Sequence, residues 1–114
     1  MADERHGAGR IGKICAAAYR IPTDRPEADG TLAWTSTTLV IVYVRAGNKR
    51  GLGFSYAHSS AVAIVRELLA PAISDRDCFD AIGCWMSVQR AVRNVGRSGI
   101  ASCAISAVDL ALWD

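Results

Sequence analysis

The sequence predicts an α+β fold, in which a three-stranded antiparallel β-meander is followed by a three-helix bundle. Two observations indicate this fold. In the first half of the chain, stretches rich in β-branched and aromatic residues alternate with turn residues, as in consecutive strands. After Tyr56 the apolar residues recur every three or four positions, which is the period of an amphipathic helix. Strands that precede the helices, and do not alternate with them, are typical of α+β proteins.

Three stretches are predicted as strands. Residues 14–21 are largely apolar and end at a proline. Residues 37–44 are β-branched at most positions and apolar on both faces, which predicts a central strand covered on both sides. Residues 51–56 complete a hairpin, and their glycines permit close approach of another backbone. Between the first two strands, residues 22–30 contain two prolines, two aspartates and a final glycine, which predicts a loop.

Three helices are predicted from the second half of the chain. The first carries an apolar stripe from Ala61 to Leu69 and ends at Pro71. The second begins near Asp77 or Asp80 and ends at Gly96. Its large apolar residues are expected to face the core, and they are Ile82, Trp85, Met86, Val88, Val92 and Val95.

The third helix, residues 99–114, is apolar around nearly its whole circumference. It has no glycine or asparagine at its end and no basic residue in its last turn. An all-round apolar helix is typical of one that is buried on every side. We therefore expect part of its cover to lie outside this chain.

Composition sets the class of protein. At 114 residues, with 51% hydrophobic and 21% charged residues, the chain fits one globular domain, with residues 1–13 as a flexible lead-in and residues 14–114 as the folded part. A net charge of +2 does not indicate a nucleic-acid partner. The sequence shows neither a signal peptide nor an apolar run long enough to span a membrane, so we expect a soluble, cytoplasmic protein without a membrane partner.

No self-contained catalytic or metal site is predicted. The four cysteines form no Cys-x-x-Cys pair, and neither histidine lies at zinc-like spacing from them, so they are expected to be reduced thiols. The acidic residues fall mostly at turns and helix starts. Two segments rich in side chains suited to recognition remain, residues 22–34 and 53–58, and loops fixed on a sheet commonly carry binding residues.

Five segments resemble, in order and spacing, the N-terminal capping domain of the mandelate racemase and muconate lactonizing enzyme branch of the enolase superfamily. They are YRIPTDRPEADGT at 19–31, TTLV at 37–40, GLGFSYA at 51–57, RNVGR at 93–97 and ISAVDLALWD at 105–114. The resemblance runs from about Ile14 to the last residue. It implies a cap that closes over a TIM-barrel domain which this chain lacks, so that the unfinished last helix marks the entry into that barrel.

The resemblance also implies a division of roles. In such enzymes the barrel holds Mg²⁺ and the bases that remove a proton next to a carboxylate, in acid-sugar dehydratases, racemases or cycloisomerases. This chain would then contain no catalytic residue and no metal site, and it would be inactive alone. Its two loops would contact a carboxylate substrate such as an acid sugar, through Thr23, Asp24, Trp34, Tyr56 and His58. For Trp34 and Tyr56, ordinary packing against the meander is an equal alternative.

The sequence is also compatible with a second class of function. In this alternative the chain is a stand-alone α+β interaction module that self-associates through its exposed last helix, residues 99–114.

Overall fold

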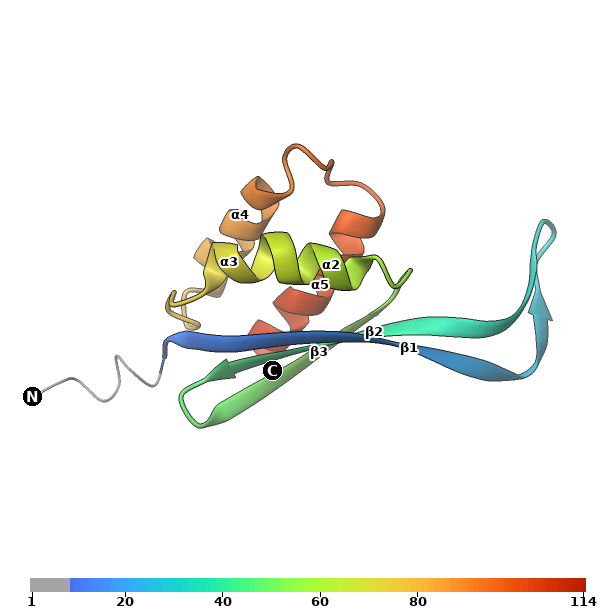
Figure 1. Ribbon diagram of the computed structural model, residues 1–114, viewed down its shortest axis with the longest axis horizontal. Coiled ribbons are helices and arrows are strands. Elements are labelled where there is room, and N and C mark those ends of the chain that lie inside the picture. The colour runs from blue at the N-terminus through green and yellow to red at the C-terminus, as the bar shows by residue number, and fades with distance from the viewer. Residues whose placement is uncertain (1–8) are drawn as a thin grey trace, which may run out of the picture.

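Three antiparallel strands form one sheet, and helices cover one of its two faces (Figure 1). The computed structural model describes residues 9–114. The strands lie side by side in the order β1 (Ile11–Ala28), β2 (Ala33–Ala46) and β3 (Lys49–Tyr56). The helical segments are α2 (Ala61–Ile64), the π-helical η1 (Val65–Leu69), α3 (Ala70–Ile73), α4 (Ala81–Ala91) and α5 (Ile100–Trp113). The first three run on without a break, so the predicted meander followed by three helices is confirmed.

Strand β1 is much longer than predicted, and the predicted loop at residues 22–30 is wrong for all but its last two residues. Pro22 pairs with Ser36, and the pairing resumes at Glu27 opposite Trp34. Both prolines of this segment fit a strand because β1 is an edge strand, and because Pro26 falls where the pairing register shifts. Of the predicted flexible lead-in, residues 1–8 lie outside the described residues, whereas residues 11–13 belong to β1.

The start of β1 is fixed by the segment between α3 and α4. The Ile11 amide donates to the carbonyl of Arg76 at 2.8 Å, and the Ile11 carbonyl accepts from the Asp75 amide at 2.8 Å. Ile11 itself is buried.

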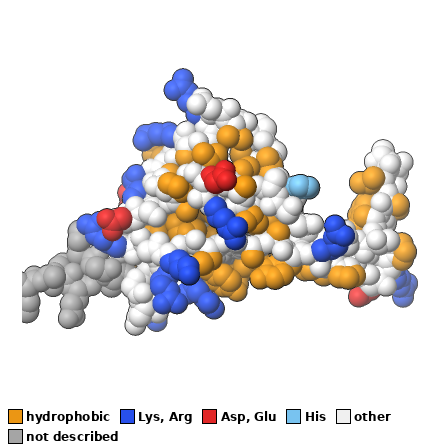
Figure 2. All heavy atoms as spheres, in the orientation of Figure 1, with side chains coloured by type: hydrophobic (Ala, Val, Ile, Leu, Met, Phe, Trp, Pro, Cys, Tyr) orange, Lys and Arg blue, Asp and Glu red, His pale blue; other side chains and the backbone are white. Residues whose placement is uncertain are grey.

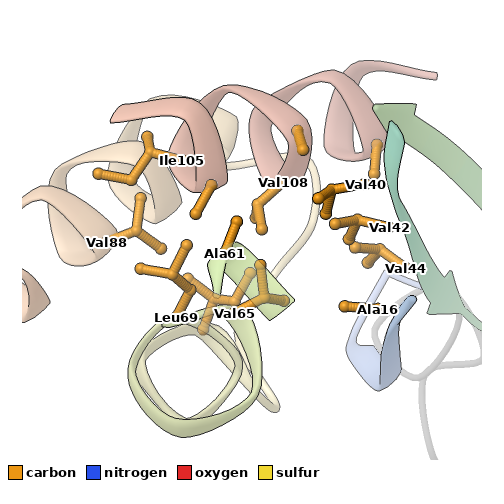
Figure 3. Close-up of a cluster of buried hydrophobic side chains, with 14 of the residues drawn as sticks. Ala16, Val40, Val42, Val44, Ala61, Val65, Leu69, Val88, Ile105 and Val108 are labelled. Atoms are coloured by element: carbon orange, nitrogen blue, oxygen red, sulfur yellow. The ribbon is translucent and has the colours of Figure 1, made fainter. Parts of the chain in front are cut away.

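The sheet has a covered face and an open face. On the covered face Val40, Val42 and Val44 of β2 are buried, and they point toward residues of the helices (Figure 3). Residues of the opposite parity are half-buried or exposed, so the prediction that β2 is covered on both sides is wrong. We call the following residues the open sheet face: Cys15, Ala17, Tyr19, Ile21, Thr37, Leu39, Ile41, Tyr43, Arg45, Arg50, Leu52, Phe54 and Tyr56.

Helix α5 lies directly against β3 at two glycines. A Cβ atom on Gly53 would come within 1.8 Å of the Ala107 carbonyl oxygen, and one on Gly51 within 1.9 Å of the Ala111 carbonyl oxygen. Any side chain at either position would therefore push the helix away from the sheet. The predicted close backbone approach at these glycines is confirmed.

The first helix does not end at Pro71, contrary to the prediction. It continues to Ile73, and Pro71 lies in the first turn of α3, directly after the π-helical η1. A proline has no N–H to donate, and its ring crowds the carbonyl four residues before it. The wider π-helical turn removes the need for that hydrogen bond, so the helix passes through the proline.

Helix α4 is rotated relative to the prediction. Its buried residues are the small Ala81 and Cys84 together with Val88, followed by Val92 after the helix. Ile82, Trp85, Met86 and Val95 are exposed, so their predicted place in the core is wrong. The small side chains let α4 pack closely against its neighbours, and the large ones stay outside.

Helix α5 finds most of its cover within the chain. Its buried residues contact β2, β3 and the other helices, whereas Leu110 and Trp113 remain exposed. The expectation that the helix is covered from outside the chain is wrong for its buried residues, and it stays a prediction for the exposed strip. Among residues 9–114, no helix is long and apolar enough to cross a membrane.

Candidate functional site

The ends of β1 and β2 form a hairpin arm, which we define as residues 22–36. The arm extends beyond the helices and bends toward the side of the sheet on which they lie (Figure 1). Near the bend, four residues of β1, residues 23–26, stand opposite the single residue Thr35 of β2. Such a register shift increases the local twist and re-aims the strand.

Side-chain hydrogen bonds fix the arm at two levels. The Trp34 ring N–H donates to Glu27 Oε2 at 3.0 Å, which joins the two strands just beyond the shift. Inside the shifted segment, Thr23 Oγ1 donates to the Arg25 carbonyl at 2.6 Å. These contacts orient the Trp34 indole, although the arm contributes nothing to the buried core.

The tip of the arm is held by Asp29. Its Oδ1 accepts from the Thr31 amide at 2.7 Å, the Thr31 hydroxyl at 2.9 Å and the Leu32 amide at 2.8 Å. The bond from the Thr31 amide, followed by the other two, lowers the pKa of the Asp29 carboxyl below its ordinary value of 3.8.

The second part of the site is the corner between β3 and α2, where His58 lies. The Ser60 amide donates to His58 Nδ1 at 3.1 Å, and Ser60 Oγ lies 3.0 Å from the same nitrogen. Because Nδ1 accepts the amide hydrogen bond, the neutral ring carries its proton on Nε2. The exposed ring therefore presents an N–H donor to solvent.

Arm and corner border one hollow. It is shallow and open to solvent, with a volume of about 370 Å³. Trp34, Tyr56 and His58 line it together with the hydroxyl residues Ser36, Thr37 and Thr38. The structure thus brings together three of the five candidate binding residues. The other two, Thr23 and Asp24, lie in the shifted segment between the Pro22–Ser36 and Glu27–Trp34 pairs, and they are not among its lining residues.

Sequence reasoning missed Glu27 and the three hydroxyl residues. The Asp29-Gly30 pair signals a turn, but a two-residue turn on that pair would place Glu27 opposite Leu32. The turn is centred on Gly30 and Thr31 instead, and this places Glu27 opposite Trp34. The chemistry of the hollow is that of recognition, because it combines an aromatic wall with several neutral hydrogen-bonding groups. Among residues 9–114 no group of three or more His, Cys, Asp or Glu side chains is placed to hold a metal ion.

A second surface lies at the end of α5. Exposed apolar side chains of α4 and α5, together with Phe79 shortly before α4, border two depressions. One is a groove of about 230 Å³, and the other is a larger hollow of about 580 Å³. We define this α4–α5 surface as Phe79, Ile82, Trp85, Leu110 and Trp113. Phe79 is 84% exposed and Trp113 68%, which is unusual for side chains of this size.

Comparison with known proteins gives a consistent family. The sequence model of the mandelate racemase / muconate lactonizing enzyme N-terminal domain matches residues 17–114. A 3,6-anhydro-alpha-L-galactonate cycloisomerase from Streptomyces coelicolor is 31% identical over 110 residues, which are 91% of this chain and 30% of that protein.

Solved structures agree in fold. A mandelate racemase/muconate lactonizing enzyme-like protein from Rubrobacter xylanophilus superposes with a TM-score of 0.89 at 41% identity, over 91% of this chain and 29% of that one. An L-talarate dehydratase from Polaromonas sp. JS666, complexed with Mg and L-glucarate, gives a TM-score of 0.79 at 29% identity, over 91% and 31% of the two chains. The chain spans about three tenths of the length of these relatives.

Proposed function

Because this chain belongs to the mandelate racemase / muconate lactonizing enzyme family, whose N-terminal domain matches its residues 17–114, we propose that it caps the active site of a catalytic barrel domain. One observation carries the proposal. The hairpin arm and the His58 corner border a hollow outside the core of the cap. Its lining side chains can bind a ligand, but they do not form a set of catalytic groups. A cap of this kind excludes water and selects the substrate, while the reacting groups lie elsewhere.

The substrate that suits the hollow is a polar carboxylate such as an acid sugar. Trp34 offers an apolar wall for one face of a sugar chain. His58 Nε2–H, Tyr56 and the hydroxyls of Ser36 and Thr38 offer hydrogen bonds to its oxygen atoms. Two relatives point the same way by name, since one is a cycloisomerase of an anhydrogalactonate and the other is a dehydratase complexed with L-glucarate. In this proposal Thr23 and Asp24 contact the substrate from the register shift of the arm.

The reaction itself is assigned to the barrel. In the complete enzyme, Mg²⁺ would stabilise the charge that develops when a proton is removed next to a carboxylate. The described residues of this chain do not fit a Mg²⁺ site, so we place the metal outside it, and we expect the chain alone to be inactive. Its own contribution is to bind, orient and shield the substrate.

The α4–α5 surface is the proposed seat of the barrel. Its exposed aromatic residues would be buried between the two domains. Self-association through residues 99–114 is the competing proposal, because Leu110 and Trp113 belong to the same surface. The two differ in one measurable respect, namely whether covering this surface needs a barrel or a second copy of the chain.

A domain exchange tests the capping function. We would join this chain to the barrel of the Streptomyces coelicolor cycloisomerase, in place of that enzyme's own N-terminal domain, and measure turnover of its substrate with Mg²⁺. The joined protein is expected to exceed the barrel alone by at least about tenfold, because a closed cap supplies binding and shielding. A joined protein no faster than the barrel alone, or turnover by the isolated chain, contradicts the proposal.

Substitutions in the joined protein test the site. Trp34→Ala and His58→Ala are each expected to raise KM several-fold, by about 1 kcal/mol of lost binding. Leu32→Ala is the matched control, because Leu32 is an exposed arm residue that does not line the hollow. Equal effects of all three variants would show that Trp34 and His58 make no specific contact with the substrate.

A further inference from the structure

Arg20 lies beside the hollow, at the base of the hairpin arm. It is the direct partner of Thr38 in the ladder between β1 and β2, and Thr38 lines the hollow. The preceding pair on the same face joins Ala18 to Val40, which points toward the helices, so Arg20 lies on that side of the sheet. The arm bends toward the same side (Figure 1), and one basic side chain in Figure 2 lies in the angle between the arm and the body. Arg20 is therefore on the inner side of the bend.

The side chains of Arg20 and Thr38 are close together. The Thr38 carbonyl accepts from the Ala57 amide at 3.2 Å, so the backbone groups of Thr38 point toward β3 and away from Arg20. In an antiparallel ladder, such a non-hydrogen-bonded pair brings its side chains closer than the alternate pairs do. The two Cβ atoms of such a pair lie about 4.5–5.5 Å apart, and an extended arginine side chain is longer than this separation. The Arg20 guanidinium can therefore reach the space next to Thr38.

The Arg20 guanidinium is available to a ligand. The residue is exposed, and it makes no hydrogen bond or ion pair within the described part of the chain. Two other arginines have structural roles instead. Arg66 donates to the Ala16 carbonyl at 2.9 Å, and Arg76 lies 3.8 Å from Asp80 Oδ2. Neither of these arginines lines the hollow.

The hollow itself offers no permanent cation. Its lining side chains are aromatic, hydroxyl-bearing or apolar, apart from the His58 ring. Such groups suit the hydroxyl groups of a sugar chain, whereas a negative charge needs a cationic partner. A guanidinium provides this partner because it can donate two parallel hydrogen bonds to one carboxylate. A ligand that fills the hollow and reaches Arg20 thus combines hydroxyl groups with an anionic end.

We propose that Arg20 binds a second carboxylate of the substrate, at the end that faces away from the reacting carbon. The cap is then selective for acid sugars with a carboxylate at each end. This inference rests on the proposed capping function, in which the barrel holds the carboxylate next to the reacting carbon. It assigns to this chain a specificity-determining residue outside the lining of the hollow.

A second domain exchange tests Arg20. We would join this chain to the barrel of the Polaromonas L-talarate dehydratase, in place of that enzyme's N-terminal domain, and assay it with Mg²⁺. The substrates are L-talarate, with a carboxylate at each end, and the matching acid sugar with a hydroxymethyl group at the far end. Arg20→Gln should lower kcat/KM for the dicarboxylate about tenfold, mainly through KM, because only this substrate loses a charge-assisted pair. For the monocarboxylate we expect a change of less than about twofold.

Two further variants separate binding from folding. Arg20→Lys keeps the charge but not the two parallel hydrogen bonds, so it should retain part of the preference for the dicarboxylate. Arg45→Gln is the matched control, because Arg45 is an exposed arginine near the other end of the sheet, and it should leave both substrates unaffected. Circular dichroism confirms that each variant is folded.

The outcomes distinguish this inference from the proposed function. If Arg20→Gln affects both substrates equally, or neither of them, the role of Arg20 is overturned while the capping function stands. A parent protein that prefers the dicarboxylate no more than the barrel alone does also overturns it. A joined protein no faster than the barrel alone contradicts the capping function itself, and the role of Arg20 falls with it.

Discussion

At the scale of single residues, Gly53 and Gly51 determine how closely α5 approaches the sheet. Their role is steric and not conformational, because neither has a positive φ. The backbone carbonyls of Ala107 and Ala111 occupy the space that side chains would fill. A carbonyl cannot move aside as a flexible side chain does, so any substitution must displace the whole helix.

Gly53→Ala is therefore expected to destabilise the fold. We expect the free energy of unfolding to fall by about 2–4 kcal/mol, because the added methyl separates α5 from β3. Urea unfolding followed by circular dichroism measures the change. Gly30→Ala is the control, since a Cβ atom there meets nothing within 4 Å, and it should change stability by less than about 1 kcal/mol. Similar losses from both variants would contradict the steric role.

Asp29 makes the tip of the arm sensitive to acid. Its pKa is lowered in the folded state by the bonds from Thr31 and Leu32. The carboxylate therefore stabilises the turn at every pH above its unfolded pKa, and this contribution is lost as the pH falls through the folded pKa. In an NMR titration, the amide signals of Thr31 and Leu32 should shift with a midpoint below 3.8. Asp29→Asn should abolish the shift, and a midpoint above 3.8 would contradict the assignment.

At the scale of elements, the start of α4 depends on one carboxylate. Asp80 is the N-cap, and its Oδ1 accepts from the Gly83 amide at 3.0 Å. Its ion pair with Arg76, at 3.8 Å between exposed groups, adds little. The next helix, α5, has Gly99 at its N-cap position and therefore no such side-chain cap. The two helices therefore differ in how they begin.

Removal of this cap should cost about 1 kcal/mol of unfolding free energy, as at other N-caps. Asp80→Ala tests this in urea unfolding. Asp80→Asn keeps an oxygen acceptor for the Gly83 amide and should retain most of the stability. If the asparagine variant loses as much as the alanine variant, the charge of Asp80 and not its hydrogen bond is the stabilising feature.

The same scale shows what the sequence can and cannot predict. Residues 37–44 can be predicted as a strand from sequence, because β-branched residues favour strands at both edge and central positions. Pro22 and Pro26 instead suggest a loop, and they lie in a strand only because β1 is an edge. The rotation of α4 was also beyond local reasoning. Whether Cys84 or Trp85 faces the core depends on how closely the neighbouring helices approach.

The candidate site could be predicted from sequence only in part. Trp34, Tyr56 and His58 were found from the resemblance, and the structure places them around one hollow. Thr23 and Asp24 belong to the register shift, in which four residues of β1 stand opposite Thr35, and they do not line the hollow. Register shifts depend on the pairing of two strands, so residue types alone do not locate them.

At the scale of the whole molecule, the hairpin arm makes the protein elongated. The radius of gyration is 15.8 Å, and the longest dimension is 61 Å. A compact domain of this length has a radius of gyration of about 13 Å. None of the arm residues belongs to the buried core. The arm is thus carried by the body of the domain and does not stabilise it.

Shortening the arm should leave the body folded. A variant in which residues 22–36 are replaced by Asn-Gly joins the strands by a tight turn. We expect its unfolding free energy to stay within about 1 kcal/mol of the parent, because no core contact is lost. Small-angle X-ray scattering should show the radius of gyration falling toward about 13 Å. Loss of cooperative unfolding would show that the arm supports the sheet.

The contact between α5 and β3 has a consequence for the order in which the chain acquires its structure. Asp114 Oδ2 accepts from the Leu52 amide at 3.0 Å, so a donor on the edge of β3 finds its partner 62 residues later. Until residues 107–114 leave the ribosome, β3 has neither its packing partner nor this bond. During synthesis the edge of β3 therefore stays exposed until the last residues emerge. Chaperone binding would protect the chain from aggregation during this interval.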